Sequence, residues 1–528
     1  MFWADKVKEE ALNRSKAKVE NGEPIIIRDE KTLSGRVHVG SLRGVVIHGI
    51  LHEVLLEAGV PVKYLFELND FDPMDGLPVY LDQEKFLPYM GKPLCEVPSP
   101  DGIAKNYAEY FGEEFTGVIR ELGFTPEFYR SSEAYKSGKY NDAIRTALDH
   151  AKEIKDIYKE ISGSQKNDDW LPLSVICESC GKVGTTRASN WNGETVSYEC
   201  GDFVKWGKGC GHKGEIAPFD GKAKLPWKVE WAAKFSVFNI DVEGGGKDHS
   251  TRGGSRDIAD TISRKIFKKE PPLNIPYEFF QIGGKKMSSS KGAGASSREM
   301  ADLLPPKMLR FLIASKDPNR VIEFEPEGDT MPILYDTYDT QAKSFFAGTK
   351  DDFARAFPFY HLPSERGHLV PKTLPRFSLI AFLSQMPHMD PAKEIEAMEG
   401  IALDDVSKEE LELRVTYAKR WLSQYAPENY RFEIQKELPE VAKNLESIQK
   451  DALKEIVKFL KESNEINGET LHAKLHDIKS ELSIDPKLLF SALYLSVLGR
   501  TSGPKAGWFL SVLDKEFLIK RFEEASNS

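Results

Sequence analysis

The stretch that decides the fold is residues 24–68, PIIIRDEKTLSGRVHVGSLRGVVIHGILHEVLLEAGVPVKYLFEL. It opens with an apolar run, PIII, which is typical of a buried parallel strand. The polar residues 28–35 predict a loop, after which Ser41 can cap a helix that Gly59 ends. Residues 62–68 predict the next strand. This strand–helix–strand unit indicates a parallel sheet, and such sheets bind ligands at the carboxyl ends of their strands.

The rest of the chain changes character three times. Helical stretches are predicted around residues 105–122 and 140–161, so the first part continues as an α/β domain. A glycine-rich segment with four of the five cysteines then interrupts it, and α/β character returns afterwards. Toward the C-terminus apolar residues recur at spacings of three and four, which predicts an all-α domain. The segments we expect are 1–162, 163–224, 225–331 and 332–528.

Composition excludes several classes of protein. With 528 residues, 40% hydrophobic and 29% charged, the chain is predicted to be globular and to contain several domains. We expect no membrane segment, because no apolar run approaches about 18 residues and the first residues are too charged for a signal peptide. Five cysteines exclude a disulfide scaffold and favour a cytoplasmic location. The net charge of -10 argues against non-specific coating of nucleic acid, and we expect no binding to DNA.

Two short motifs point to nucleotide chemistry. His38-Val39-Gly40-Ser41 lies where the first strand leads into a helix, so free N–H groups and the helix dipole can hold an anion there. Lys286-Met287-Ser288-Ser289-Ser290, preceded by two glycines, is a cationic loop suited to the charge of a triphosphate. Taken singly, each also fits a surface loop. Their order, with one early and one late in the same α/β region, favours the functional interpretation.

The pair resembles the signature of class I aminoacyl-tRNA synthetases, which bind ATP on a Rossmann-like fold. Within that class the chain is similar to the class I lysyl-tRNA synthetases over most of its length. The resemblance implies that residues 1–162 and 225–331 form the catalytic domain and that 332–528 bind tRNA. It also implies Mg²⁺ with ATP. The segments that carry it are 32–35 (TLSG), 225–231 (LPWKVEW), 246–249 (GKDH), 276–279 (PYEF), 417–418 (YA) and 421–422 (WL).

The resemblance also implies roles for individual residues. His38 and Lys286 resemble the catalytic pair, which holds ATP and stabilises the transition state of adenylation. The positions that resemble the ATP-binding set are His38, Gly40, Ser41, Lys286, Met287, Ser288, Ser289 and Ser290. The positions that resemble the lining of a lysine pocket are Thr32, Trp227, His249 and Tyr277. Physical chemistry supports such a pocket, because an aromatic face with a nearby carboxylate holds an ammonium group well.

Some positions depart from the family pattern. Ser41 stands where histidine or asparagine is frequent, and Ser289 stands where lysine is common. Glu30 stands where the family tends to have glycine. The carboxylate that would pair with the lysine ammonium is left open by the sequence, with Glu30, Asp70 and Asp72 as candidates. Without the resemblance, Trp227 and Tyr277 would be interpreted as core residues.

The cysteines of the inserted segment predict a structural zinc site. Cys177 and Cys180 have the spacing of a zinc knuckle, and Cys200 and Cys210 follow. Nine residues separate the second pair, so His212 is an alternative fourth ligand. A segment with few apolar residues has little besides a metal to stabilise it.

The sequence indicates RNA contacts less directly. A basic cluster at residues 264–269 can touch phosphates or be a solvated helix face. Arginines and aromatic residues alternate between 417 and 431 in the helical tail, which suits stacking of bases as well as core packing.

We expect a lysine–tRNA ligase that uses ATP and L-lysine to charge tRNA(Lys). The alternatives are a class I synthetase for another amino acid, such as glutamate, and a non-catalytic RNA-binding paralogue.

Overall fold

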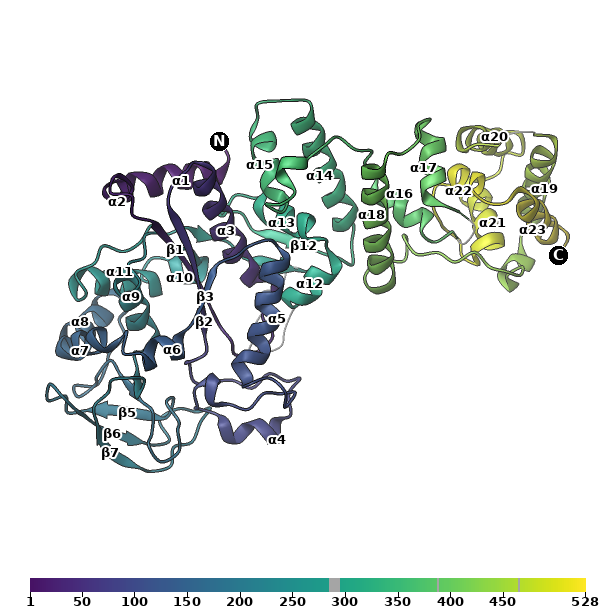
Figure 1. Cartoon of the computed structure of the whole chain (residues 1–528). Helices are drawn as coiled ribbons and strands as arrows, with labels where there is room; N and C mark the ends of the chain where they lie inside the picture. The colour runs from purple at the N-terminus through teal and green to yellow at the C-terminus, as the bar shows by residue number, and fades with distance from the viewer. Residues whose placement is uncertain (284–294, 387–388, 464–465) are drawn as a thin grey trace. The chain divides into compact units, whose positions relative to one another are not determined.

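The computed structural model describes residues 1–283, 295–386, 389–463 and 466–528. The chain forms two compact units (Figure 1). The first comprises residues 1–324 and 340–370, and the second comprises 325–339 and 371–528.

A parallel sheet lies at the centre of the first unit (Figure 1). Its strands β1 (Ile25–Thr32), β2 (Val62–Asn69) and β3 (Glu127–Arg130) pair in the order β1-β2-β3, with Ile25 opposite Val62. Single parallel bridges join Ile27 to Val242 and Val242 to Leu273, so the parallel arrangement continues beyond β1. The predicted Rossmann-like architecture is confirmed.

Strand β1 is longer than the sequence predicted. We expected a loop over residues 28–35, but Arg28 to Thr32 continue the strand beside β2. Arg28 is fully buried and Asp29 is 8% exposed. A run of charged residues normally indicates exposure to solvent. These residues are buried because ion pairs compensate their charges.

Helix α3 (Leu42–Glu57) follows β1 through the short 3-10 helix η1 (Val39–Ser41). Ser41 occupies the N-cap position, but its side chain makes no capping hydrogen bond. Gly59, with φ of 72°, follows the end of α3 as expected. Contrary to expectation, the helical segment Val39–Glu57 is long and apolar enough to span a membrane, but 78% of it is buried inside the protein. Its apolar residues therefore belong to the core of the first unit.

Helices surround the sheet of the first unit. The helix expected at 105–122 is present as α5 (Tyr107–Glu121). The helix expected at 140–161 is divided at His150 into α7 (Asn141–Asp149) and α8 (Ala151–Ser162). The further elements are α1 (Trp3–Arg14), α2 (Lys16–Glu20), α4 (Gln83–Phe86), η2 (Leu87–Tyr89), η3 (Leu94–Glu96), α6 (Ser131–Lys136), α9 (Trp227–Val237), β9 (Gly245–Gly246), α10 (Lys247–Ser250), α11 (Ser255–Lys265), β10 (Pro276–Tyr277), β11 (Phe280–Ile282), α12 (Ser297–Leu303), α13 (Pro306–Ala314), β12 (Ile322–Phe324), α15 (Asp352–Tyr360) and η5 (Arg366–His368).

The cysteine-containing insertion is built from short antiparallel strands. Strands β5 (Thr186–Ser189), β6 (Val196–Cys200) and β7 (Lys213–Ile216) form one sheet. Strand β4 (Ser174–Val175) pairs with β8 (Ala223–Lys224), so the insertion starts and ends on neighbouring strands. Its apolar side chains, among them Val196 and Tyr198, share one hydrophobic core with α7, α8, α9 and α11.

The second unit is helical, as expected. Its core is formed by residues such as Leu453, Leu493 and Phe522. Helix α14 (Thr330–Phe346) contributes residues to both units. The other helices are α16 (Phe377–Leu383), α17 (Pro391–Glu399), α18 (Asp405–Gln424), η6 (Glu440–Asn444), α19 (Ser447–Glu462), α20 (Gly468–Glu481), α21 (Pro486–Leu498), α22 (Ala506–Ser511) and α23 (Lys515–Asn527).

Candidate active site and metal centre

A pocket of about 360 Å³ lies at the carboxyl end of β1, where a parallel sheet is expected to bind ligands. Residues from β1, η1, α9, β9, β10 and β11 line it. It brings together all the site residues that the sequence suggested for ATP and lysine within the described part of the chain. These are Thr32, His38, Gly40, Ser41, Trp227, His249 and Tyr277.

The flanks of the two nucleotide motifs meet beside this pocket. His38 forms a β-bridge with Ser296, and the Val39 amide donates to the carbonyl of Ala295 at 3.1 Å. On the other flank, Phe280 of β11 lines the pocket. Residues 286–290, with Lys286, Met287, Ser288, Ser289 and Ser290, lie outside the described residues.

Two tryptophans of α9 form an aromatic wall. Trp227 and Trp231 are one helical turn apart, and their rings stack with centroids 5.8 Å apart and planes 16° apart. The His249 ring meets Trp227 edge-on at 5.2 Å. Trp231 is 5% exposed and belongs to the core, whereas Trp227 is 38% exposed and faces the pocket. An exposed aromatic face at a pocket is suited to a cationic or planar ligand.

The glycine run opposite this wall allows the backbone to approach its neighbours. Gly246 pairs with Tyr277, and a Cβ on Gly244 would lie 2.6 Å from the carbonyl oxygen of Ile275. The Gly244 amide donates to Nε2 of the buried His48 at 2.8 Å. Asp29 lies 3.3 Å from the other ring nitrogen of His48. Burial tends to lower the pKa of His48, but Asp29 raises it above its ordinary value.

Buried charges form a network beneath the pocket that sequence reasoning missed. Arg28 donates to Glu67 at 2.5 Å, to Glu243 at 2.9 Å and to Glu30. Lys234 of α9 lies 2.6 Å from Glu30 and 2.8 Å from Glu67. Burial tends to lower the pKa of Lys234, but the surrounding glutamates raise it well above its ordinary value. Lys234 therefore stays charged inside the protein.

The network continues to the end of β2. Lys224 lies 2.6 Å from Glu230 and 3.0 Å from Asp72. Asp72 also accepts a hydrogen bond from the hydroxyl of Thr32 at 2.9 Å. Asp70 accepts hydrogen bonds from Ser131 and Ser132. Neither Asp70 nor Asp72 lines the pocket, whereas Glu30 does.

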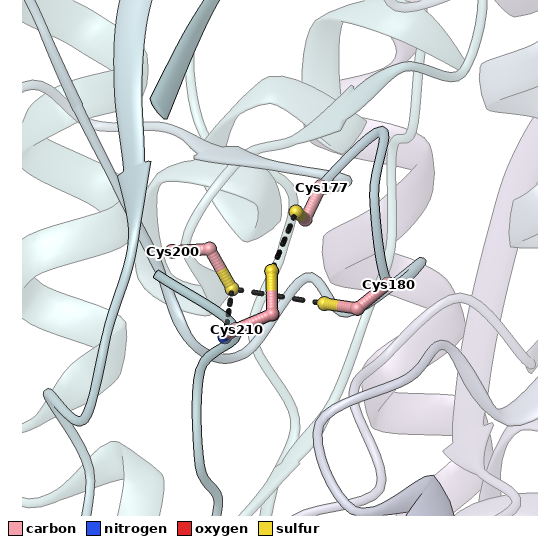
Figure 2. Close-up of side chains that lie close together, drawn as sticks. All are labelled: Cys177, Cys180, Cys200 and Cys210. Carbon is pink, nitrogen blue, oxygen red and sulfur yellow. Dashed lines mark hydrogen bonds between the residues drawn. The ribbon is translucent and has the colours of Figure 1, made fainter. Parts of the chain in front are cut away.

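The four cysteines of the insertion converge on one point (Figure 2). The Sγ atoms of Cys177, Cys180, Cys200 and Cys210 all lie within 4.8 Å of one another, and the pairs 177–210 and 180–200 are 3.7 Å apart. A tetrahedral zinc ion with bonds of about 2.3 Å separates its sulfurs by about 3.8 Å, so the thiols fit such an ion. His212 is not part of this group, and its ring lies 5.8 Å from that of Tyr198.

Several of the side chains considered for RNA contact have partners within the protein. In the basic cluster, Arg264 pairs with Glu270 and Lys265 with Glu160. In the tail, Trp421 is fully buried, and its indole donates to the carbonyl of Pro326. Trp421 therefore supports the helical scaffold.

Comparisons with known proteins identify the family. The family model "tRNA synthetases class I (K)" matches residues 1–366, and the model "Anticodon binding domain" matches 423–526. Lysine--tRNA ligase of Methanosarcina barkeri (strain Fusaro) is 35% identical, covering 100% of this chain and 98% of the relative. Lysine--tRNA ligase of Archaeoglobus fulgidus is 32% identical, covering 99% and 100%.

Among solved structures, a glutamate tRNA ligase from Elizabethkingia meningosepticum has a TM-score of 0.43 at 12% identity, covering 96% of this chain and 100% of that one. This score is too low to bear on the fold or the substrate. The family model covers more than half of the chain, and the relatives match it from end to end. The chain belongs to the class I lysyl-tRNA synthetase family.

Proposed function

We propose that this lysine–tRNA ligase activates L-lysine with ATP in the pocket at the end of β1 and transfers the lysyl group to tRNA(Lys). The observation that carries the proposal is the convergence in one pocket of two sets of residues that are far apart in sequence. The first set, at 38–41, resembles an ATP site. The second, from Thr32 to Tyr277, resembles a lysine site.

On the ATP side, His38, Gly40 and Ser41 lie at the start of the long helix α3. The dipole of this helix favours phosphate at its N-terminus. The bridge between His38 and Ser296 joins the first motif to a residue that follows the second motif in the chain. We assign Lys286 to stabilising charge on the α-phosphate, and Met287, Ser288, Ser289 and Ser290 to the same ATP-binding loop. Mg²⁺ accompanies the phosphates of ATP in this scheme.

The reaction needs little covalent chemistry from the protein. A carboxylate oxygen of lysine attacks the α-phosphorus in line, the bond to the bridging oxygen breaks, and pyrophosphate leaves with the electron pair. The lysyl-adenylate then gives its acyl group to a terminal ribose hydroxyl of tRNA, and AMP leaves. Positioning and charge stabilisation supply the rate, so no serine or cysteine nucleophile is required.

The remaining parts of the molecule have supporting roles. We assign Zn²⁺ to the four cysteines as a structural ion that holds the insertion together, because these thiolates form a closed set of ligands. The match of residues 423–526 to an anticodon-binding model supports tRNA recognition by the second unit. The protein acts in the cytoplasm in this scheme, without membrane or DNA.

Exchange of pyrophosphate into ATP, measured with each of the twenty amino acids in the presence and absence of tRNA, tests the proposal. We expect exchange with lysine alone. Exchange that depends on glutamate would show that the enzyme activates glutamate and would refute the proposed specificity for lysine. A protein that supports no exchange under either condition but still binds tRNA would be a non-catalytic paralogue.

A further inference from the structure

We propose that Glu30 determines specificity for a cationic amino acid by binding the side-chain ammonium with its Oε1 oxygen. The inference rests on the proposed function and identifies, within that pocket, the group that selects the substrate's charge.

Glu30 combines a fixed position with a free acceptor. Its Oε2 oxygen accepts from Lys234 at 2.6 Å and from Arg28, which lie on α9 and β1. Its Oε1 oxygen accepts no hydrogen bond from the described residues, and the side chain is 23% exposed at the pocket. An ionised carboxylate offers about four lone-pair positions, so a further donor can be accepted without breaking the existing pairs. Glu30 is therefore oriented in advance for an incoming cation.

Three of the four other acids that line the pocket, Asp29, Glu243 and Glu278, are less suited to this role. Both oxygens of Glu243 are engaged, one by Trp231 at 2.6 Å and the other by Arg28 at 2.9 Å. Glu278 pairs with Lys247 at 2.5 Å. Asp29 lies beside His48 and accepts from the backbone amide of Glu30 at 2.8 Å.

The charges around Glu30 favour a cation. The buried network contains three cations and five carboxylates, which are Arg28, Lys224 and Lys234 against Glu30, Glu67, Asp72, Glu230 and Glu243. Burial raises the pKa of Glu243, yet with Glu243 protonated four carboxylates still face three cations. Burial also tends to raise the pKa of Glu30, but Lys234 and Arg28 lower it, so Glu30 is ionised.

Charged residues of both signs lie next to the network. Asp29 and Lys31 flank Glu30 on β1 with opposite charges, and Arg256 pairs with Asp260 at 2.7 Å. The buried network itself carries uncompensated negative charge before the substrate binds. A lysine side chain compensates it, whereas a neutral or acidic side chain leaves it in place or adds to it. Trp227 adds an aromatic face for the same ammonium.

Glu67 provides a matched control for the experiment. It contacts Arg28 and Lys234 as Glu30 does, but its side chain is fully buried and does not line the pocket. Glu30→Gln and Glu67→Gln each remove one charge from the same network. In Glu30→Gln the donors Lys234 and Arg28 hold the amide oxygen, so an NH2 group replaces the acceptor that faces the substrate. Glu30→Asp keeps the charge while withdrawing it by one methylene group.

The full-length variants are compared by pyrophosphate exchange with lysine and with norleucine, the analogue that lacks the ammonium. For Glu30→Gln we expect the lysine KM to rise at least tenfold, with kcat and the ATP KM within threefold of wild type. The preference for lysine, given by the ratio of kcat/KM for lysine to kcat/KM for norleucine, should fall at least tenfold. Glu67→Gln should keep the preference, even where thermal unfolding shows that it destabilises the protein.

Specific outcomes would overturn the inference. One is a Glu30→Gln enzyme with an unchanged lysine KM and preference. Another is an equal loss of preference in Glu67→Gln, which would assign selectivity to the network rather than to Glu30. If Glu30→Gln fails to fold, Glu30→Asp decides: a raised lysine KM with retained preference supports the role, and an unchanged KM refutes it. A wild-type protein that exchanges only with another amino acid would refute the proposed function instead.

Discussion

Gly244 is the position at which the structure predicts the sharpest effect of adding one methyl group. In Gly244→Ala the new Cβ would lie 2.6 Å from the Ile275 carbonyl oxygen and 3.1 Å from His48 Nε2. Overpacking of this kind costs about 1–3 kcal/mol. Weakening the hydrogen bond between the Gly244 amide and His48 adds about 0.5–1.5 kcal/mol. We therefore expect a loss of about 2–4 kcal/mol in the free energy of unfolding.

This loss can be measured as a shift in Tm. The first unit has roughly 350 residues, so its entropy of unfolding is about 0.7 kcal/mol/K. The expected decrease in Tm is about 3–6 °C by scanning calorimetry. Because Gly244 also lines the pocket, we expect the rate of pyrophosphate exchange by Gly244→Ala to fall at least tenfold. Gly245→Ala is the stability control, since its Cβ would meet no atom closer than 3.6 Å. Equal Tm values for the two variants would refute this reasoning.

Three further changes test other parts of the molecule. Lys286→Ala should lower the kcat of pyrophosphate exchange at least 100-fold and leave the lysine KM within threefold of wild type, because Lys286 is assigned to stabilising charge in the transition state. An unchanged kcat would contradict this assignment. Elemental analysis of the purified proteins should find no zinc in Cys210→Ser, whereas Cys95→Ser, which lies outside the cluster, should retain the ion. Zinc in both variants would exclude the four-thiolate site. Burial tends to raise the pKa of Asp5, but Arg355 lowers it below its ordinary value of about 4. Ionised Asp5 therefore stabilises the folded state at pH values above about 4. This contribution is lost as the pH falls through the lowered pKa. Asp5→Asn should therefore flatten the acidic limb of the stability curve measured by urea unfolding between pH 7 and pH 3, and curves of equal slope would contradict the pairing.

Local patterns in the sequence identified the main features of the fold and of the pocket. The apolar run at residues 24–27, the helix ended by Gly59 and the strand after it predicted the parallel sheet, because a strand–helix–strand unit requires parallel strands. The four cysteines were found because metal ligands have recognisable spacing. The break between α7 and α8 at His150 was missed, because apolar residues on both sides keep helical spacing.

The buried charges could not be predicted, because their partners lie far apart in the chain. Glu30 and Lys234 are separated by 204 residues, and Arg28 and Glu243 by 215. Without a partner in view, Arg28 and Glu30 were interpreted as part of a loop. The tail posed the opposite difficulty. Trp421 suits base stacking by residue type, but its complete burial follows from the packing of helices that a linear pattern does not specify.

The pairing of β4 with β8 has a consequence for how the chain tolerates change. Val175 and Ala223 are cross-strand neighbours, so the segments before and after the insertion are joined by a connection whose ends already lie together. Lengthening or shortening the intervening segment need not alter the distance between Thr32 and Trp227, provided that the core residues around Val196 remain covered. The insertion is therefore a place where a tag, a sensor or a binding domain can be grafted without realigning the substrate pocket.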